Sequence, residues 1–194
     1  MARMRADERR AQILVAARES FLVTGPEATR VRDIADRAGV NEALLYRHFD
    51  SQEDLFRSAI VEPLNDVVVR LLAEATALPA EDDAIVDHTY KFFHAMLGIL
   101  SESIELFGVV LFSDRAGGRD FYSTQFGPFI DAVSDTVRSN LAAWSHRPFD
   151  PNVTTPVFVG MCWGLAMDAH FRGRTLDLEA SARLMTDITF QGLR

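Results

Sequence analysis

The sequence contains one cysteine, Cys162, so the chain cannot form an internal disulfide. Arg, Asp, Glu or Pro interrupts each apolar run before it reaches the length of a membrane span. The first ten residues also lack the apolar core of a signal peptide. These absences argue against a disulfide-stabilised secreted domain and a membrane protein. We expect a cytoplasmic protein that has no membrane partner.

The sequence motifs of common catalytic sites are missing too. We find no H-E-x-x-H, G-x-S-x-G, Walker loop or G-x-G-x-x-G. His88 and His94 are six residues apart, so they do not share a helix face as metal ligands four residues apart do. Cys162 lies in an apolar stretch typical of an inert small side chain. We therefore expect no catalytic residue, no metal site, no cofactor and no enzyme activity.

The sequence has no strand pattern, internal repeat or low-complexity tract. No stretch alternates apolar and polar residues between hairpin turns, whereas apolar residues recur at helical spacing. With 48% hydrophobic and 25% charged residues, the 194-residue chain is able to build a packed core. The expected fold class is therefore all-α.

Charge alone does not suggest a nucleic-acid partner, because the net charge is −8. Residues 1–58 contain ten Arg and ten Asp or Glu, a sum of zero. Residues 59–194 contain ten Arg or Lys against eighteen Asp or Glu, which gives the entire −8. An acidic second part discourages non-specific association with DNA.

Residues 31–50 predict two short helices, 31–38 and 42–48, joined by a tight turn. Gly39 follows the last apolar residue of the first helix, where a left-handed backbone favours glycine. Asn41 suits the N-cap of the second helix. The start of that second helix has small, polar and aromatic residues on its outer side, a shape that enters the major groove in helix-turn-helix proteins.

Residues 31–54 resemble the helix-turn-helix of the tetracycline-repressor (TetR) family. The matching residues are Val31, Ile34, Ala35, Ala38, Gly39, Val40, Leu45, Tyr46, His48, Phe49, Ser51, Glu53 and Leu55. The motif-level resemblance covers about the first 60 residues. It implies about nine to ten helices, with a three-helix DNA-binding domain at residues 1–58. The fourth helix then leads into a helical ligand-binding and dimerisation domain at residues 59–194.

The resemblance also implies which residues meet DNA. Tyr46 and His48 match residues that hydrogen-bond phosphates, although packing under the recognition helix would explain them too. The base-edge candidates are Glu42, Leu44 and Arg47. The full expected set is Thr29, Arg30, Arg32, Asn41, Glu42, Ala43, Leu44, Tyr46, Arg47, His48 and Gln52.

Several positions depart from the family pattern. Arg30 stands where Ser or Thr is usual, so either Thr29 provides the helix cap or Arg30 replaces a hydroxyl contact with a charged one. Ala43 replaces a frequent Gly, and Gln52 replaces a Lys that commonly meets a phosphate. An N-terminal arm of arginines either reaches phosphates or belongs to a scaffold helix; its members are Arg3, Arg5, Arg9 and Arg10.

The remaining helices are predicted from the helical spacing of apolar residues and from the residues that begin or end helices. Pro63 is expected to kink the fourth helix or mark a joint in it. The sequence predicts helices over 7–23, 51–72, 84–100, 104–112, 120–144, 156–171 and 178–191. Loops are expected at 113–119 and 145–152.

The second part is rich in phenylalanine, which predicts an apolar, aromatic-lined cavity between its middle helices. Core packing would explain each of these residues individually. The expected lining residues are Phe92, Phe93, Met96, Phe107, Leu111, Phe126, Phe129, Trp163 and Met167. Polar anchors are sought among His88, His94, Asp168 and His170. The last two helices are expected to form a dimer through Val159, Trp163, Ala166, His170, Leu184 and Ile188.

The favoured hypothesis is a homodimeric transcriptional repressor. It would bind a near-palindromic operator in double-stranded DNA and be released by a small apolar or aromatic effector. One alternative is a helical sensor or interaction module that retains the motif as a scaffold, without sequence-specific DNA binding. The other alternative is an activator, which the sequence does not distinguish from a repressor.

Overall fold

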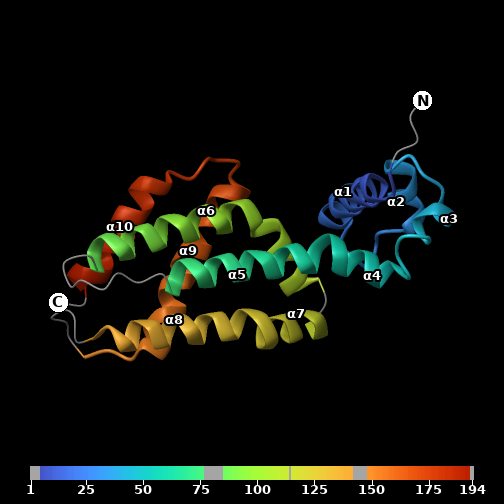
Figure 1. Cartoon of the computed structure of the whole chain (residues 1–194). Helices are drawn as coiled ribbons and strands as arrows, with labels where there is room; N and C mark the ends of the chain where they lie inside the picture. The colour runs from blue at the N-terminus through green and yellow to red at the C-terminus, as the bar shows by residue number, and fades with distance from the viewer. Residues whose placement is uncertain (1–4, 77–84, 114, 142–147, 193–194) are drawn as a thin grey trace. The chain divides into compact units, whose positions relative to one another are not determined.

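The computed structural model describes residues 5–76, 85–113, 115–141 and 148–192. Over these ranges all regular structure is helical, which confirms the predicted all-α class (Figure 1). The α-helices are α1 (Ala6–Thr24), α2 (Val31–Arg37), α3 (Glu42–Leu45), α4 (Gln52–Phe56), α5 (Glu62–Thr76), α6 (Ile85–Phe112), α7 (Arg115–Phe121), α8 (Gly127–Ser139), α9 (Pro151–Phe171) and α10 (Leu178–Gly192). Two π-helical segments, η1 (Arg57–Val61) and η3 (Tyr122–Phe126), interrupt them.

The chain divides into two compact units. The first consists of Met1–Asp66 and Glu105–Phe121, and the second of Val67–Ile104 and Tyr122–Arg194. The first unit includes the whole predicted DNA-binding domain. The expected domain boundary between residues 58 and 59 stays a prediction.

The core of the first unit forms where α1 packs against α2 and α4. Ile13 and Phe21 of α1 are fully buried, as are Leu45 of α3 and Leu55 of α4. The ring of Phe21 meets that of Phe56 edge to face, with centroids 5.2 Å apart. Full burial of such side chains contributes about 1.5–3 kcal/mol each relative to exposure. This core holds the short helices α2 and α3, which are too short to be stable alone.

Both π-helical segments precede a proline. Pro63 is the second residue of α5, after η1, and Pro128 is the second residue of α8, after η3. Proline has no N–H for the carbonyl four residues earlier, and its ring clashes with that carbonyl. A wider π turn before the proline accommodates both effects. The joint expected at Pro63 is therefore present, one turn earlier than the proline itself.

Helix α6 is continuous, so the predicted break around Ser101–Ser103 is wrong. Leu97, Leu100, Ile104 and Phe107 are all buried, at spacings of three, four and three residues. This apolar stripe runs past the serines, and its packing outweighs their preference for helix ends. By length and composition alone, α6 is the one helix in the described ranges that is able to cross a membrane. A core helix meets the same criterion, and the buried stripe identifies α6 as one.

The predicted loop at 113–119 is also wrong, because α7 begins at Arg115. Gly118 permits a close approach within the first unit. A Cβ atom there would lie 2.4 Å from the carbonyl oxygen of Leu111. The glycine therefore permits close packing inside a helix and does not mark a loop. The predicted helix over 120–144 is divided among α7, η3 and α8, and residues 142–144 lie outside the described ranges.

Helix α9 begins five residues earlier than predicted. Its N-cap is Asp150, whose side chain accepts a hydrogen bond from the backbone N–H of Asn152 at 2.9 Å, and Pro151 occupies the first helical position. The pair Thr155–Pro156, which has the same cap-and-proline pattern, lies inside the helix. The predicted end at Gly173 is confirmed by a positive φ of 61°. The last predicted helix corresponds to α10.

Candidate functional site

The helix-turn-helix is built by local backbone chemistry. Gly39 has a φ of 63°, which glycine adopts without steric cost, and the next backbone N–H, that of Val40, donates to the carbonyl of Ala35 at 2.9 Å. Asn41 then caps α3, since its side chain accepts a hydrogen bond from the N–H of Leu44 at 2.8 Å. The glycine and the cap predicted from the sequence are both in place. Helix α3 ends at Leu45, earlier than expected, and continues as turns to His48.

The residues of α3 and the following turn divide into two faces. Leu45 and Phe49 are buried and attach the segment to the core. Leu44 and His48 are half-buried. The exposed residues are Asn41, Glu42, Ala43, Tyr46 and Arg47. A side-chain set of this kind is free to approach base edges and phosphates in a major groove.

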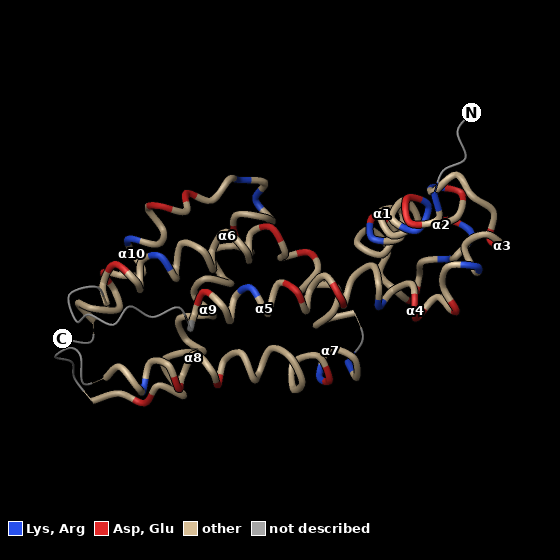
Figure 2. The backbone as a smooth tube through the Cα atoms, in the orientation of Figure 1, with Lys and Arg blue, Asp and Glu red and all other residues tan. Residues whose placement is uncertain are grey.

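Charged residues of both signs lie along α1 to α4 (Figure 2), and two cations of α2 have acidic partners. Arg37 donates to Glu19 at 3.0 Å, and Arg32 lies 3.9 Å from Asp36. Arg30 and Arg47 are exposed and have no carboxylate partner among the described residues. These two guanidinium groups are therefore available to an anionic ligand.

Thr29 and Gln52 have internal partners. Thr29 is 5% exposed, and its hydroxyl lies 2.6 Å from both the carbonyl oxygen of Gly25 and the hydroxyl of Thr24. The N-cap of α2 is Arg30, without a side-chain cap. The side chain of Thr29 is thus too deeply buried for the expected surface role, because the loop before α2 folds over it. The amide of Gln52 donates to the carbonyls of Pro26 and Thr29, so it fastens this loop to α4.

The N-terminal arginines belong partly to the scaffold. The guanidinium of Arg10 lies 4.9 Å from the centroid of the Phe49 ring and donates to the hydroxyl of Ser58 at 3.3 Å. Arg9 donates to Gln12 at 2.8 Å. Arg5 is the N-cap of α1, and Arg3 lies outside the described residues. For Arg10, these contacts favour the scaffold alternative over a phosphate-binding arm.

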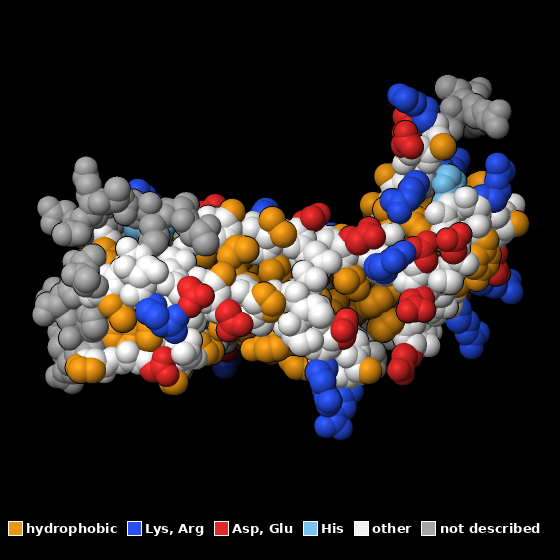
Figure 3. Space-filling model, turned by 60° about the horizontal axis from the view of Figure 1, so that its bottom comes forward, with side chains coloured by type: hydrophobic (Ala, Val, Ile, Leu, Met, Phe, Trp, Pro, Cys, Tyr) orange, Lys and Arg blue, Asp and Glu red, His pale blue; other side chains and the backbone are white. Residues whose placement is uncertain are grey.

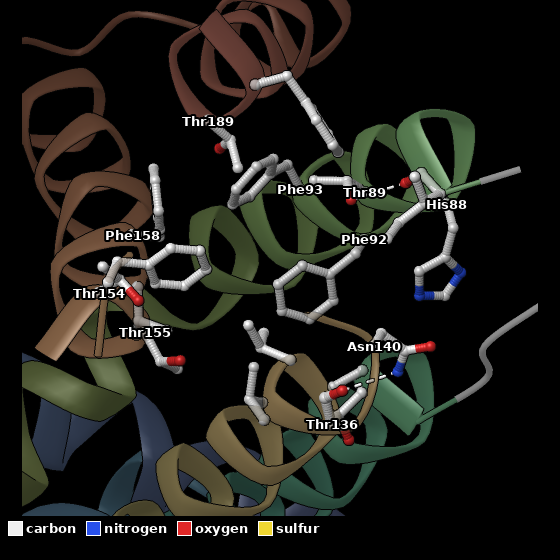
Figure 4. Close-up of a pocket in the computed structure, with 17 residues that line it drawn as sticks. His88, Thr89, Phe92, Phe93, Thr136, Asn140, Thr154, Thr155, Phe158 and Thr189 are labelled. Carbon is white, nitrogen blue, oxygen red and sulfur yellow. Dashed lines mark hydrogen bonds between the residues drawn. The ribbon is translucent and has the colours of Figure 1, made fainter. Parts of the chain in front are cut away.

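The second unit contains an apolar cavity of about 120 Å³ (Figure 4). Its walls come mainly from α6, α8, α9 and α10. The described lining residues are Ala75, Ile85, His88, Thr89, Phe92, Phe93, Val133, Thr136, Val137, Asn140, Phe149, Thr154, Thr155, Phe158, Val159, Thr189 and Phe190. None of them is Asp, Glu, Lys or Arg. Engineered apolar cavities of roughly 150 Å³ hold a benzene-sized molecule.

Of the predicted lining residues, Phe92 and Phe93 line this cavity and the other seven do not. The others are Met96, Phe107, Leu111, Phe126, Phe129, Trp163 and Met167. Several of these pack on one another: the Phe126 ring lies 5.6 Å from that of Phe129 and 6.5 Å from that of Trp163. These large side chains fill space that the prediction left open, while Val133, Val137 and Phe158 supply walls that it missed. Periodicity identifies apolar faces but does not indicate where two faces leave a gap.

Of the four predicted polar anchors, one lines the cavity and three do not. His88 lines the cavity, and burial, with a contribution from nearby Lys91, lowers the pKa of its imidazole. Its neutral form is therefore favoured. His94, Asp168 and His170 do not line the cavity. Asp168 instead accepts hydrogen bonds from Arg172, at 2.6 Å, and from Arg174.

Helix α9 has an inner and an outer face. Val159 and Ala166, predicted at the dimer interface, are buried inside the chain itself, and Trp163 is half-buried. The exposed apolar and glycine residues of α9 are Val153, Val157, Gly160, Gly164 and Phe171. On α10, Leu184 and Ile188 are exposed, with 57% and 41% of their surface accessible, and His170 of α9 is exposed too; their place at a dimer interface stays a prediction. Figure 3 shows apolar side chains at the surface in several patches among charged ones.

Comparison with known proteins gives matches of two kinds. Residues 13–59 match the family described as bacterial regulatory proteins, tetR family. Over 91 residues the chain is 43% identical to the HTH-type transcriptional repressor Rv3405c of Mycobacterium tuberculosis. This match covers 47% of this chain and 48% of the relative. Over 66 residues it is 41% identical to the HTH-type transcriptional activator FasR of Mycolicibacterium smegmatis, covering 34% and 30%.

The fold likeness extends further than the sequence likeness. The structure of the fatty acid degradation regulator FadR of Bacillus halodurans matches with a TM-score of 0.72 at 16% identity, covering 100% of this chain and 99% of that chain. The sequence matches, by contrast, span about a third to a half of the two curated relatives. Both relatives are named as transcriptional regulators and not as enzymes. The matched segment forms a capped helix-turn-helix, so residues 13–59 are similar in sequence and local structure to the family described as bacterial regulatory proteins, tetR family.

Proposed function

We propose that this protein is a cytoplasmic, homodimeric transcriptional repressor that binds a near-palindromic operator in double-stranded DNA. The observation that carries the proposal is the exposed face formed by α3, which the Asn41 cap fixes, and by the turn after it, where Tyr46 and Arg47 lie. Arg47 is suited to a bidentate contact with guanine, and Tyr46 and His48 to phosphates. Arg30 and Arg32, at the start of α2, would add phosphate contacts.

The dimer is proposed to form through the outer face of α9 and α10. A second copy would cover Val157 and Phe171 of α9 together with Leu184 and Ile188 of α10, which are otherwise exposed to water. Gly160 and Gly164 lie on the exposed side of α9, and a Cβ at either would meet no neighbour in the single chain. Small residues allow two such helices to approach closely. A symmetric dimer would place two recognition helices about 34–36 Å apart, or a multiple of this distance.

The cavity in the second unit is proposed to bind a small apolar or aromatic effector that lowers DNA affinity. Nine of its described lining residues are Phe, Val or Ile, and no charged side chain lines it. An effector changes DNA affinity only by the difference between its affinities for the DNA-competent and DNA-incompetent states. Regulation by a ligand therefore requires that cavity occupancy and recognition-helix spacing be coupled.

An activator is the second candidate, because one relative, FasR, is named an activator. Repression is favoured because the similarity to the repressor Rv3405c extends over a longer segment, 91 residues against 66. A reporter gene placed behind the recovered operator separates the two: repression lowers its expression when the protein is supplied, and activation raises it.

The test is selection of bound fragments from the source genome at near-physiological salt. The protein is first unfolded and refolded, so that no co-purified effector remains. We expect one enriched near-palindrome and a steep loss of affinity as salt rises. Fragments without a shared sequence, bound by protein whose helicity has been recovered, would contradict the proposal and favour a sensor module.

A further inference from the structure

One hydroxyl group at the cavity is fully buried and has no hydrogen-bond partner among the described residues. Thr155 of α9 is 4% exposed, and its Oγ1 is buried without a hydrogen bond among the described residues. Its side chain lines the cavity and extends from α9 toward the cavity space (Figure 4). Leaving a buried hydroxyl unpaired is unfavourable, and native proteins rarely do so without a role for the group.

The reason lies in the neighbouring helix. A threonine inside a helix usually donates to the carbonyl four residues earlier, as Thr154 does to Asp150 at 3.2 Å. For Thr155 this carbonyl belongs to Pro151. The hydroxyl of Ser134 on α8 lies 3.3 Å from it, and 2.9 Å from the carbonyl oxygen of Ile130 in its own helix. The other lone pair of the Pro151 carbonyl faces the backbone N–H of its own helix. Ser134 thus competes for the carbonyl that usually pairs with a helical threonine hydroxyl, and Oγ1 of Thr155 has no hydrogen bond among the described residues.

Several other polar side chains around the cavity have partners within the protein. Thr89 donates to Ile85 at 2.8 Å, and Thr189 to Met185 at 2.8 Å. The amide of Asn140 donates to the carbonyl of Thr136 at 2.8 Å. The remaining walls are largely aromatic; the rings of Phe93 and Phe158, for example, lie 5.9 Å apart. The cavity thus combines a buried, unpaired hydroxyl with a wall that favours a ring.

We propose that Thr155 is the polar anchor of the effector, and that the effector is an uncharged, ring-sized molecule with one hydrogen-bonding oxygen. A phenol or a cyclic ketone has this chemistry. A carboxylate or an ammonium group would lose its hydration without gaining an opposite charge, so the cavity selects against ions. A plain hydrocarbon of the same size would fit but would leave the hydroxyl of Thr155 unpaired. The inference rests on the proposed effector site and adds the class of ligand.

Titration calorimetry with phenol, toluene and benzoate tests the inference on three proteins: the native sequence, Thr155→Val and Thr154→Val. Valine keeps the shape of threonine and removes the hydroxyl. Thr154 is the matched control, because it lines the same cavity but its hydroxyl is already bonded. We expect phenol to bind the native protein more tightly than toluene or benzoate. Thr155→Val should weaken phenol binding roughly tenfold and leave toluene unchanged, and Thr154→Val should alter neither by more than about twofold.

A melting curve verifies that each variant is folded. Thr155→Val should be at least as stable as the native protein, since it loses an unpaired buried hydroxyl. Equal phenol affinity in the native protein and Thr155→Val would overturn the inference, as would benzoate binding more tightly than phenol or no binding of phenol at all. The titration contains no DNA, so its outcome is separate from that of the proposed function. If phenol bound through Thr155 but did not change operator affinity, the proposed control of DNA binding by the effector would be refuted. The ligand class assigned to the cavity would stand.

Discussion

Gln52 donates a hydrogen bond from its side-chain amide to the carbonyl oxygen of Thr29, 2.9 Å away, and a second to that of Pro26 at 3.0 Å. The first residue of α4 thereby holds the loop that leads into α2. In the resemblance to the TetR family, this position was expected to contact a phosphate. In the structure, the amide of Gln52 donates to two backbone carbonyls of the protein itself.

Replacing Gln52 by Ala should therefore destabilise the fold. Loss of two partly buried hydrogen bonds predicts a decrease of about 1–2 kcal/mol in the free energy of unfolding. Urea denaturation followed by circular dichroism measures it. Glu53→Ala, which removes an exposed neighbouring side chain, is the control and should change stability by less than about 0.5 kcal/mol. Equal stability of the two variants would mean that these hydrogen bonds do not hold the loop.

Gly118→Ala should also destabilise the protein, because its Cβ would lie 2.4 Å from the carbonyl oxygen of Leu111. Relief of this contact requires a backbone shift, for which we expect a cost of about 1–3 kcal/mol. Gly108→Ala is the matched change in α6, where a Cβ meets nothing within 4 Å. It should be neutral or stabilising by up to about 1 kcal/mol. The two melting temperatures, measured side by side, should move in opposite directions or differ by several degrees.

Cys162 should be inert in the folded protein. Its side chain is fully buried, and burial raises the pKa of the thiol to about 12. Because the thiolate is the reactive form, iodoacetamide at pH 8 should leave the native protein unlabelled and label it completely in denaturant. Mass spectrometry gives the labelled fraction. Rapid labelling under native conditions would show that α9 and α10 open around this residue.

His88 should titrate below its ordinary pKa of about 6.5, since burial disfavours the imidazolium. Between the lowered pKa and 6.5 the unfolded chain binds more protons than the folded one. This histidine therefore stabilises the fold fully above about pH 6.5, and its contribution falls as the pH drops through the lowered pKa. A proton NMR titration of the imidazole, assigned with His88→Gln, measures the midpoint. A midpoint at or above 6.5 would contradict the burial of His88.

The helix-turn-helix was predictable because its determinants are local. Gly39 provides the left-handed turn, and Asn41 caps the next helix three residues before its bonding partner Leu44. Each of these effects depends on residues close in sequence. The exposed and buried faces of α3 follow from the same spacing. The continuous helix α6 was missed because Ser101 and Ser103 suggest an end locally, while packing of Leu100 and Ile104 continues the helix.

The cavity was less predictable for the same physical reason. Met96 and Phe126 are apolar at helical spacing, as are Val133 and Phe158, yet the first two are packed in the core and the last two line a cavity. The difference depends on how α6, α8 and α9 meet. The unpaired hydroxyl of Thr155 has no sequence signature either, because its burial depends on how α8 and α9 pack, as the approach of Ser134 to the carbonyl of Pro151 shows.

Arg47 provides the most direct test of sequence-specific DNA recognition. We would titrate the selected operator with the native protein, Arg47→Ala and Arg70→Ala, following the bound fraction by fluorescence anisotropy at fixed salt. Arg70→Ala removes the same charge from α5, outside the helix-turn-helix. If α3 recognises DNA, Arg47→Ala should lose roughly tenfold or more in operator affinity, with unchanged helicity and stability, and Arg70→Ala should bind like the native protein. Native operator affinity in folded Arg47→Ala would contradict the role assigned to α3.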